Sequence, residues 1–433
     1  MKNFIEPRVL KGFRDFLPAQ EIERRHLTEI IEKNFRSFGF VPIDTPALEY
    51  ADILLGKMEG EINKQVYRFA DNGGRDVALR FDLTVPFARF CAEHYSELVL
   101  PFKRYHIAKV WRGENTQRGR YREFTQCDAD IVGTKSLATD AEIILLMRQT
   151  ILALLQGGGI TIKINHRGLF NRFLSELKLG EKSADVLRAV DKLAKTGEEA
   201  VMENLIDISG KAEAEKIMRW VKAKDLEELI ALTGGPSDES NELGLLFKYF
   251  TDAGISDAGQ NGSSLVLDPS ITRGLDYYTG IVFETFLNEM PEIGSICSGG
   301  RYDNLAALYT KENLPGVGAS IGLDRLIAAL DALQEKQGKP ANQTGFADCA
   351  ILCSNEDDAG KYQALAKRFR DAGLAVTVFT EAKKPVQQYI QAEKQGIPWV
   401  LTIEETGLSL REIATRQDYK DLSAEEAIKT IKK

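Results

Sequence analysis

The stretch Leu267-Asp-Pro-Ser-Ile-Thr-Arg-Gly-Leu-Asp-Tyr-Tyr-Thr-Gly-Ile-Val-Phe-Glu284 decides how the rest of the chain is interpreted. Its second half, continuing to residue 286, is rich in β-branched and aromatic residues and predicts a strand. An Asp-Pro turn and a glycine precede that strand, together with Arg273, Asp276, Tyr277 and Tyr278. A cation, a carboxylate and two phenols could hold a polar substrate together with an anion. An edge strand with solvated charges and core tyrosines is the simpler alternative.

Length and composition bound the class of protein. The chain has 433 residues, of which 43% are hydrophobic and 28% charged, which indicates a globular protein with room for two or three domains. No apolar run is long enough to cross a bilayer, so we expect no membrane partner. The formal net charge of −8 argues against bulk, non-specific binding of nucleic acid but leaves room for a local basic surface.

Cysteine and histidine usage indicates a reducing compartment. The five cysteines, at positions 91, 127, 297, 349 and 353, are spaced too widely for a disulfide framework or a zinc ribbon. The four histidines are scattered, so no metal-binding residue is assigned. The first residues lack the apolar core of a signal peptide and the Arg/Ser-rich character of a transit peptide. We therefore expect a cytoplasmic protein.

The N-terminal part begins with an amphipathic helix over residues 21–38, where apolar residues recur at helical spacing. The strand expected at 40–46 contains two prolines, which have no N–H to donate to a neighbouring strand. Such a strand suits the edge of a sheet or a contact between subunits, and the residues alone favour the edge.

A β-hairpin is predicted next, with strands at 66–70 and 76–82 around the Asn-Gly-containing turn at 71–75. A helix follows, and Thr84 is placed to cap it. Asp82 lies at the junction of strand and helix, where side chains often meet ligands but also often serve as turn or capping residues.

A second hairpin carries the densest charge in the chain. Its strands, residues 105–112 and 120–131, flank a polar loop that contains two glycines. Residues of one parity share a face of a strand, which groups Gln126, Asp128 and Asp130, and likewise Arg120, Arg122 and Phe124. Arginines suit phosphate because guanidinium forms bidentate, charge-assisted bonds, and the acids could hold an ammonium or an imidazole. A solvated charged hairpin is the alternative.

Glycine-rich segments mark the later part of the first domain. Residues 168–260 are rich in Lys, Glu, Ala and Leu at helical spacing and predict an inserted helical module. In Gly299-Gly-Arg-Tyr-Asp303, paired glycines would let the backbone approach a ligand that Arg301 and Tyr302 touch. The glycine-rich segment 316–322 predicts a strand that enters a helix, with Arg325 near the start of that helix.

The tail predicts a separate small domain. Residues 334–345 have the composition of a linker. After the linker, strands at 348–353, 374–379 and 399–403 alternate with helices at 357–371 and 384–395. This alternation is typical of an α/β domain with a parallel or mixed sheet.

Together these segments resemble class II aminoacyl-tRNA synthetases, and specifically histidyl-tRNA synthetases, over nearly the whole chain. The helix and strand through Pro46 resemble the first class motif, Arg112-Gly-Glu114 through Phe124 the second, and Gly322-Leu-Asp-Arg325 the third. The most specific likeness lies in the two histidine signatures, Arg273-Gly-Leu-Asp-Tyr-Tyr278 and Gly299-Gly-Arg-Tyr-Asp303, which occur in the family's order.

The resemblance implies an α+β fold, with a six-stranded antiparallel catalytic sheet flanked by helices and a C-terminal α/β anticodon-binding domain. It implies a homodimer joined through the first motif. With the insertion and the linker placed by composition, the expected boundaries are residues 1–167 and 261–333 for the catalytic domain, 168–260 for the helical insertion, 334–345 for the linker and 346–433 for the anticodon-binding domain.

The resemblance also implies a two-step reaction. The carboxylate of L-histidine attacks the α-phosphorus of ATP, with Mg²⁺ on the departing diphosphate, and the histidyl group then passes to tRNA(His). Arg112 and Arg273 would be catalytic, gripping the α-phosphate and the substrate carboxylate. Phe124 and Arg325 would sandwich the adenine. The remaining implied ATP contacts are Glu114 and Arg120.

For the amino acid, the resemblance implies that Asp82, Thr84 and Gln126 hold the α-ammonium group. Asp130 and Tyr278 would read the imidazole, and Tyr277 and Tyr302 would line the same pocket. The implied RNA contacts are Gln117, Arg118, Lys383, Lys384 and Gln388.

Two alternatives remain open from the sequence. The first is the synthetase-like regulatory subunit of ATP phosphoribosyltransferase, a binding protein that usually lacks both the tail and the Arg273 signature. The second is a synthetase of the same class for another amino acid, which the histidine signatures disfavour.

Overall fold

The computed structural model describes residues 4–56, 64–155, 158–255, 262–271, 277–336 and 345–433. The chain divides into two compact units. The larger comprises residues 1–14 and 27–337, and the smaller comprises residues 15–26 and 338–433. Arg273 and Asp276, singled out from the sequence, lie outside the described residues.

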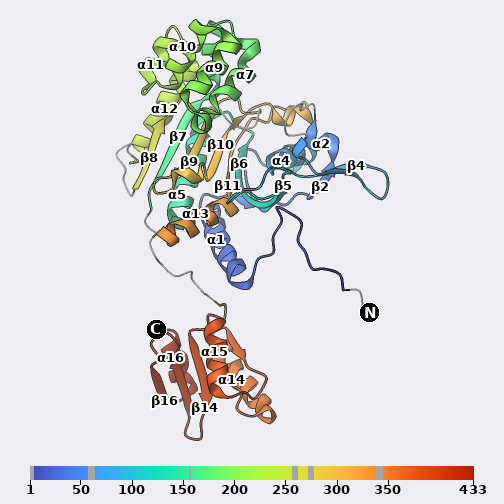
Figure 1. Ribbon diagram of the computed structural model, residues 1–433, viewed down its shortest axis with the longest axis vertical. Helices are drawn as coiled ribbons and strands as arrows, with labels where there is room; N and C mark the ends of the chain where they lie inside the picture. The colour runs from blue at the N-terminus through green and yellow to red at the C-terminus, as the bar shows by residue number, and fades with distance from the viewer. Residues whose placement is uncertain (1–3, 57–63, 156–157, 256–261, 272–276, 337–344) are drawn as a thin grey trace. The chain divides into compact units, whose positions relative to one another are not determined.

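An eight-stranded sheet forms the centre of the larger unit, counted over the described ranges (Figure 1). Its order is β1 (Val41–Pro42), β5 (Phe102–Trp111), β6 (Glu123–Val132), β11 (Gly316–Gly322), β10 (Cys297–Tyr302), β9 (Ile281–Leu287), β7 (Ile160–His166) and β8 (Ser263–Leu267). The six strands from β5 to β7 are antiparallel, which confirms the expected catalytic sheet. A parallel strand is added at each edge. The proline-bearing strand, β1, lies at the edge of the sheet, as the residues favoured. The strand predicted after Tyr278, β9, lies inside the sheet, so the alternative of an edge strand is wrong for that segment.

One face of the sheet is apolar. Odd-numbered side chains of β6, such as Cys127 and Ile131, are fully buried in a core shared with helices α1 (Pro18–Ser37), α5 (Leu137–Leu155) and α13 (Leu323–Lys336). Burying this face against helices supplies the main driving force for assembling the sheet. The even-numbered side chains of β6 are left for the opposite face, where the polar residues gather.

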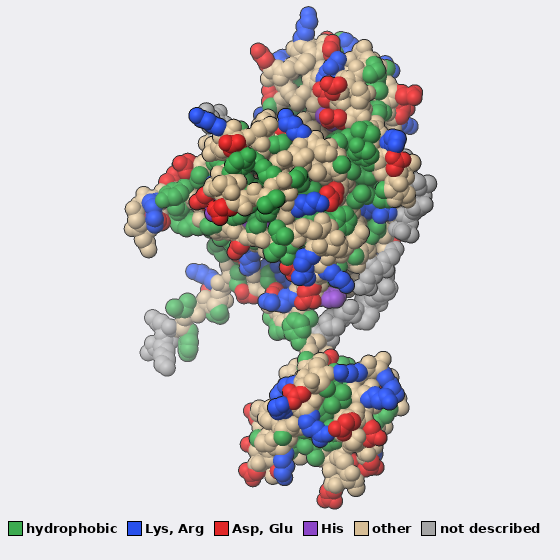
Figure 2. Space-filling view, turned by 180° about the vertical axis from the view of Figure 1, so that it is seen from behind, with side chains coloured by type: hydrophobic (Ala, Val, Ile, Leu, Met, Phe, Trp, Pro, Cys, Tyr) green, Lys and Arg blue, Asp and Glu red, His purple; other side chains and the backbone are tan. Residues whose placement is uncertain are grey.

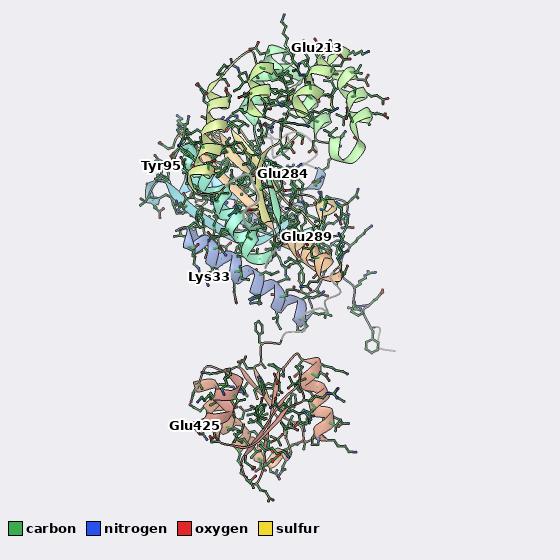
Figure 3. The ribbon with its side chains drawn as sticks, turned by 90° about the vertical axis from the view of Figure 1, so that its left-hand side faces the viewer. Lys33, Tyr95, Glu213, Glu284, Glu289 and Glu425 are labelled. Carbon is green, nitrogen blue, oxygen red and sulfur yellow. The ribbon has the colours of Figure 1, made fainter. Side chains whose placement is uncertain are left out.

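The segment between β7 and β8 is helical, as its composition predicts. It contains α6 (Arg167–Glu176), α7 (Ser183–Val190), α8 (Leu193–Thr196), α9 (Glu198–Ser209), α10 (Lys211–Val221), α11 (Leu226–Leu232) and α12 (Asp238–Asp252). Trp220 is fully buried and stacks on Phe173 with ring centroids 4.6 Å apart, so this segment has aromatic packing of its own. Figure 3 contrasts Glu213 on these helices with Glu284, which lies within the strands of the main sheet.

A small three-stranded sheet joins β2 (Leu48–Tyr50), β4 (Asp76–Leu79) and β3 (Arg68–Ala70), and confirms the hairpin predicted around residues 71–75. Hydrophobic side chains cover part of its projecting surface, at the left of Figure 2. Leu48, Tyr50 and Phe69 are exposed there.

The prediction that Thr84 caps the following helix, α4 (Thr84–Glu93), is wrong. The Asp82 carboxylate performs that task, because its Oδ1 accepts a hydrogen bond from Val85 N–H at 3.1 Å. The first N–H groups of a helix have no partner within the helix. Asp82 lies one residue before the N-cap, Leu83, and its side chain supplies a partner to one of these groups.

In the smaller unit, a mixed sheet has the order β13 (Val376–Val378), β12 (Cys349–Ile351), β14 (Trp399–Ile403), β15 (Leu408–Glu412) and β16 (Asp418–Leu422). The first three strands are parallel and the last two antiparallel. Helices α14 (Ala359–Asp371) and α15 (Pro385–Lys394) match the prediction, while β15, β16 and α16 (Ala424–Ile431) were not predicted. Within the residues that can be described, no helix combines the length and apolar character needed to cross a membrane.

Candidate active site

A row of polar side chains crosses the face of the sheet opposite the apolar core. The strand register places Glu284, Ser298, Ser320, Asp128 and His106 side by side on five neighbouring strands. Glu284, Asp128 and His106 are buried, although buried ionisable groups are rare in cores. Such a row indicates a site that binds a polar ligand.

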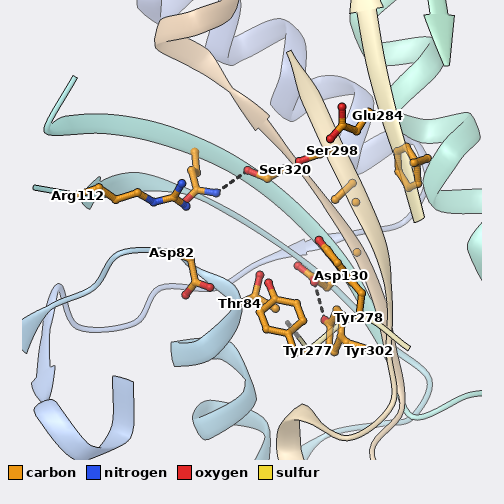
Figure 4. Close-up of a pocket in the computed structure, with 15 residues that line it drawn as sticks. Asp82, Thr84, Arg112, Asp130, Tyr277, Tyr278, Glu284, Ser298, Tyr302 and Ser320 are labelled. Atoms are coloured by element: carbon orange, nitrogen blue, oxygen red, sulfur yellow. Dashed lines mark hydrogen bonds between the residues drawn. The ribbon is translucent and has the colours of Figure 1, made fainter. Parts of the chain in front are cut away.

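A pocket of about 300 Å³ opens on this face (Figure 4). Arg112 and Asp82 lie on one side of it, and Asp130, Tyr278 and Tyr302 lie together at another. The lining is completed by Thr84, Gln126, Tyr277, Phe283, Glu284, Ser298, Gly299, Gly318, Ala319 and Ser320.

Most residues expected to bind the amino acid meet in this pocket, although they come from four separate parts of the chain. Asp82 and Thr84 lie at the start of α4, and Gln126 and Asp130 on β6. Tyr277 and Tyr278 precede β9, and Tyr302 ends β10. Arg112, expected to bind phosphate, also lines the pocket.

Asp130 is held from two sides. Tyr302 donates its O–H to Asp130 Oδ1 at 2.6 Å, and Arg104 Nη2 lies 2.7 Å from Asp130 Oδ2. Burial raises the pKa of Asp130, and the Arg104 cation and the Tyr302 hydrogen bond oppose that shift. The carboxylate is thus fixed as a hydrogen-bond acceptor at the pocket wall.

Glycines in β10 and β11 make room for these side chains. A Cβ added at Gly318 would lie 1.9 Å from Asp130 Oδ1, and one at Gly316 would lie 2.4 Å from the Tyr302 ring. At Gly300 a Cβ would lie 2.9 Å from Tyr278. These glycines therefore let side chains of the pocket lie directly on the strands. That is a different use from the close approach of a ligand expected from the sequence, although Gly299 does line the pocket.

The Asp82 side of the pocket also carries a buried acid. Burial raises the pKa of Asp82 to about 6, against the opposing effects of the Val85 N–H bond and of Arg112 and Arg104. Tyr277 lies beside it, hydrogen-bonded to Thr84, and burial raises the Tyr277 pKa well above its usual value. At neutral pH this side of the pocket offers an ionised carboxylate and neutral phenols.

The Arg112 guanidinium is oriented by backbone and ring contacts. Its Nε donates to Phe81 O at 2.9 Å, and its carbon lies 5.2 Å from the centre of the Phe124 ring. The N-terminal segment braces the loop that follows Arg112, because Arg122 N–H donates to Gly12 O at 2.9 Å and the Arg14 guanidinium lies 3.7 Å from the centre of the Tyr121 ring. The cation is therefore positioned before any ligand arrives.

The other residues expected at the nucleotide lie beside the pocket and are not part of its lining. Arg120 pairs with Glu114 at 3.7 Å in the loop after β5. Arg325 donates to Ser295 O at 2.7 Å from the first turn of α13. Its neighbour Asp324 accepts from Thr125 N–H at 2.7 Å, next to Phe124. Arg325 and Phe124 are thus brought into one region by the contact between α13 and β6.

The sequence interpretation missed several residues of this site and misplaced one. Arg104 had a usable signal, since it shares the parity of His106 and lies across the strand pair from Asp130. Ser320 had none until the order of the strands was known. The expectation that Arg301 touches a ligand is wrong, because Arg301 turns to the other face of the sheet, where it pairs with the buried Asp140.

The residues expected to contact RNA lie elsewhere. Gln117 and Arg118 are exposed in the loop after β5, where Arg118 pairs with Glu335 at 3.2 Å. In the smaller unit Lys383 and Lys384 are exposed at the start of α15. Gln388 is only 2% exposed, and its amide bonds Cys353 N–H, Cys353 O and Lys383 O. Its side chain therefore holds the Lys383 segment in place and is not available to a base.

Comparison with known proteins decides the family. The family model for histidyl-tRNA synthetase matches residues 12–326, and the model for an anticodon-binding domain matches residues 348–433. A histidine–tRNA ligase of Treponema denticola is 52% identical over 415 residues, which cover 93% of this chain and 90% of that protein.

The chain belongs to the histidyl-tRNA synthetase family. The crystal structure of a histidyl-tRNA synthetase from Nostoc sp. PCC 7120 is 30% identical and covers 99% of both chains with a TM-score of 0.84. A protein from Bacillus halodurans described as an ATP phosphoribosyltransferase regulatory subunit/histidyl-tRNA synthetase is 23% identical, covers 90% of this chain and 96% of its own, and has a TM-score of 0.71. That second likeness concerns the fold alone.

Proposed function

We propose that this member of the histidyl-tRNA synthetase family activates L-histidine with ATP and transfers the histidyl group to tRNA(His). The observation that carries the proposal is the pocket in which a buried acid, Asp130, lies with the phenols of Tyr278 and Tyr302, and which the Arg112 side chain lines from another side. The tail's match to an anticodon-binding domain favours this function over that of a regulatory subunit, which does not need to read an anticodon.

In this proposal the pocket reads both ends of the amino acid. Asp130 accepts the N–H of one imidazole nitrogen and Tyr278 meets the other, so an apolar side chain would leave buried polar groups without partners. Asp82, Thr84 and Gln126 hold the α-ammonium group. Because the Asp82 pKa is about 6, this binding should weaken as the pH falls through 6.

Arg112 and Arg273 act on the reacting groups. Negative charge accumulates around the α-phosphorus as the histidine carboxylate attacks it, and guanidinium groups fixed beforehand favour that transition state over the ground state. Phe124 and Arg325 sandwich the adenine, with Glu114 and Arg120 near the nucleotide. ATP enters as its Mg²⁺ complex, and the positive charge of the metal ion would offset the negative charge of the departing diphosphate.

We further propose a homodimer in the cytoplasm. Four large apolar side chains are exposed on β1 and on the small sheet, where they favour burial against another chain: Val41, Leu48, Tyr50 and Phe69. Sedimentation of the Tyr50→Glu variant tests this contact. A monomer is expected for the variant and a dimer for the native protein, and a native monomer would contradict the proposal.

The tRNA contacts are proposed at two regions of the RNA, the acceptor end and the anticodon. Gln117 and Arg118 approach the acceptor end, and Lys383 with Lys384 approaches the anticodon, while Gln388 supports that segment from within. The division into a catalytic domain (1–167 and 261–333), a helical insertion (168–260), a linker (334–345) and an anticodon-binding domain (346–433) is part of the same proposal.

Charging of tRNA(His) with labelled histidine tests the whole function. Native protein should charge tRNA(His), and Arg112→Ala should lose most of that activity because it removes a positioned cation. Arg75→Ala is a matched control, since Arg75 is an exposed arginine of the 71–75 turn paired with Asp71. Adenylate formation without charging would contradict the proposed transfer step, and equal losses in both variants would contradict the role of Arg112.

A further inference from the structure

Arg104 is a fully buried arginine behind the wall of the pocket. It lies on β5 directly opposite Asp130 on β6, with 0% of its surface exposed. Its Nη2 lies 2.7 Å from Asp130 Oδ2 and donates to Leu83 O at 3.3 Å, and its guanidinium packs 4.1 Å from the centre of the Phe87 ring. Arg104 does not line the pocket, so any effect on a ligand must pass through residues that do, and among these Asp130 is the one that Arg104 contacts as an ion pair.

A buried cation is costly unless an acid compensates it, and the region holds three buried acids. Asp82, Asp128 and Asp130 are each at most 2% exposed. Burial raises the pKa of all three, to about 6 for Asp82 and about 7 for Asp128, and Arg104 opposes the shift in every case. Of the three, Asp130 forms the ion pair with Arg104.

We propose that Arg104 is the positioning residue of the imidazole site, the counter-ion that keeps Asp130 ionised and holds its carboxylate in place at the pocket wall. This inference rests on the proposed role of Asp130 in binding the imidazole. With Oδ2 on Arg104 and Oδ1 receiving the Tyr302 O–H, the carboxylate has only acceptor positions left to offer. The imidazole nitrogen that meets Asp130 must therefore carry a hydrogen.

A neutral Asp130 would bind differently. A protonated carboxyl group is itself a donor, so it could meet an unprotonated ring nitrogen and would no longer select one tautomer of the substrate. Loss of the cation would favour that neutral form, because the carboxyl group would remain buried without its closest opposite charge. Arg104 thus acts on specificity without touching the substrate.

The charged and titratable groups around Asp130 come from every element packed against it. They are Arg104 on β5, Asp128 on β6, Tyr302 on β10, Tyr278 before β9, Asp82 before α4 and Cys91 within α4. Arg104 is the cation among them that touches Asp130. Its removal should therefore raise the Asp130 pKa further, and the acids nearby should add to the effect.

The test compares the histidine KM in ATP–diphosphate exchange from pH 6 to pH 9 for native protein, Arg104→Met and Arg104→Lys. At pH 7, Arg104→Met should raise the histidine KM by roughly ten- to a hundredfold, the effect of losing a charge-assisted contact. The ratio to native should shrink as the pH rises and Asp130 ionises, while the ATP KM stays near native. Arg104→Lys keeps the charge and should recover much of the loss.

Arg80→Met is the matched control. Arg80 is also a buried arginine, but its guanidinium donates to backbone oxygens, Thr45 O at 2.5 Å and Lys109 O at 3.0 Å. Its ion pair, at 3.9 Å, is with the exposed Asp44, which does not line the pocket. Its removal should lower thermal stability without a pH-dependent change in the histidine KM. A ratio for Arg104→Met that is constant with pH, or a native histidine KM, would overturn the proposal and leave Arg104 as packing.

Thermal unfolding supplies a measurement that does not need activity. Without its cation, buried Asp130 has a folded-state pKa above the already raised value in native protein. The stability of Arg104→Met relative to native should therefore fall as the pH rises through the folded-state pKa of native Asp130. A difference in unfolding midpoint that is independent of pH would also overturn the proposal.

The unfolding measurement tests the Arg104–Asp130 pair without any substrate. The proposed function has its own test, because it fails if native protein shows no histidine-dependent exchange. If Arg104→Met does not fold, the Arg104→Met/Asp130→Asn double variant removes both charges and should regain folding. If the double variant also fails to fold, the unpaired charge of Asp130 is not the reason that Arg104→Met fails to fold, and the result counts against the proposal.

Discussion

A single methyl group added at Gly318 should disable the imidazole site. An ideal Cβ there would lie 1.9 Å from Asp130 Oδ1, whereas real Cβ contacts essentially never fall below 3.0 Å. The Asp130 carboxylate would have to retreat by about 1 Å, out of reach of Tyr302, which now donates to it at 2.6 Å. A misplacement of about 1 Å can cost roughly a hundredfold in rate, or about 2.7 kcal/mol of transition-state stabilisation.

The assay is ATP–diphosphate exchange at varied histidine and varied ATP. We expect Gly318→Ala to lower kcat/KM for histidine by about a hundredfold and to leave the KM for ATP close to native. Gly244→Ala on α12 is the control, because its Cβ would make only an ordinary 3.5 Å contact with Leu226. A Gly318→Ala enzyme within about threefold of native, or roughly 0.7 kcal/mol, would refute this account of Asp130.

Three further variants test separate parts of the site. Tyr302→Phe should raise the histidine KM by about tenfold or more in the exchange assay, because Asp130 loses a hydrogen bond to a charged group. Asp128→Asn should gain stability over native as the pH rises from about 4 to about 7, by on the order of 4 kcal/mol in chemical denaturation, since burial raises the Asp128 pKa to about 7 and native protein must ionise it. A pH-independent difference would count against that burial effect. Gly12→Ala should raise the ATP KM several-fold, because its Cβ would lie 2.6 Å from the Arg122 side chain in the loop after β5. Gly39→Ala is the control: Gly39 has a similarly positive φ, but a Cβ there meets nothing within 4 Å, so this variant should affect stability alone.

The sequence predicted local structure well where side-chain periodicity carries the information. Alternation along β6 placed Gln126, Asp128 and Asp130 on one face, and all three are buried on that face. The hairpin around residues 71–75 followed from its turn residues. Both features depend on neighbours in the chain, which local pattern can describe.

The order of the strands could not be predicted from the residues, and the site depends on it. Ser320 lies beside Asp128, and Ser298 beside Ser320, only because β10 and β11 lie between β9 and β6. Arg301 illustrates the reverse error, since its face of β10 could be settled only once Asp140 on α5 was known to lie beneath it. The six-stranded antiparallel sheet was predicted from the resemblance to a family and not from the spacing of residues along the chain.

ATP–diphosphate exchange with each of the twenty amino acids tests the central claim most directly. The account predicts exchange with histidine alone, largely abolished in Arg273→Ala, which removes a cation proposed to bind the reacting carboxylate and α-phosphate. Exchange with a different amino acid, or with none in folded protein, would contradict the claim that this chain activates histidine.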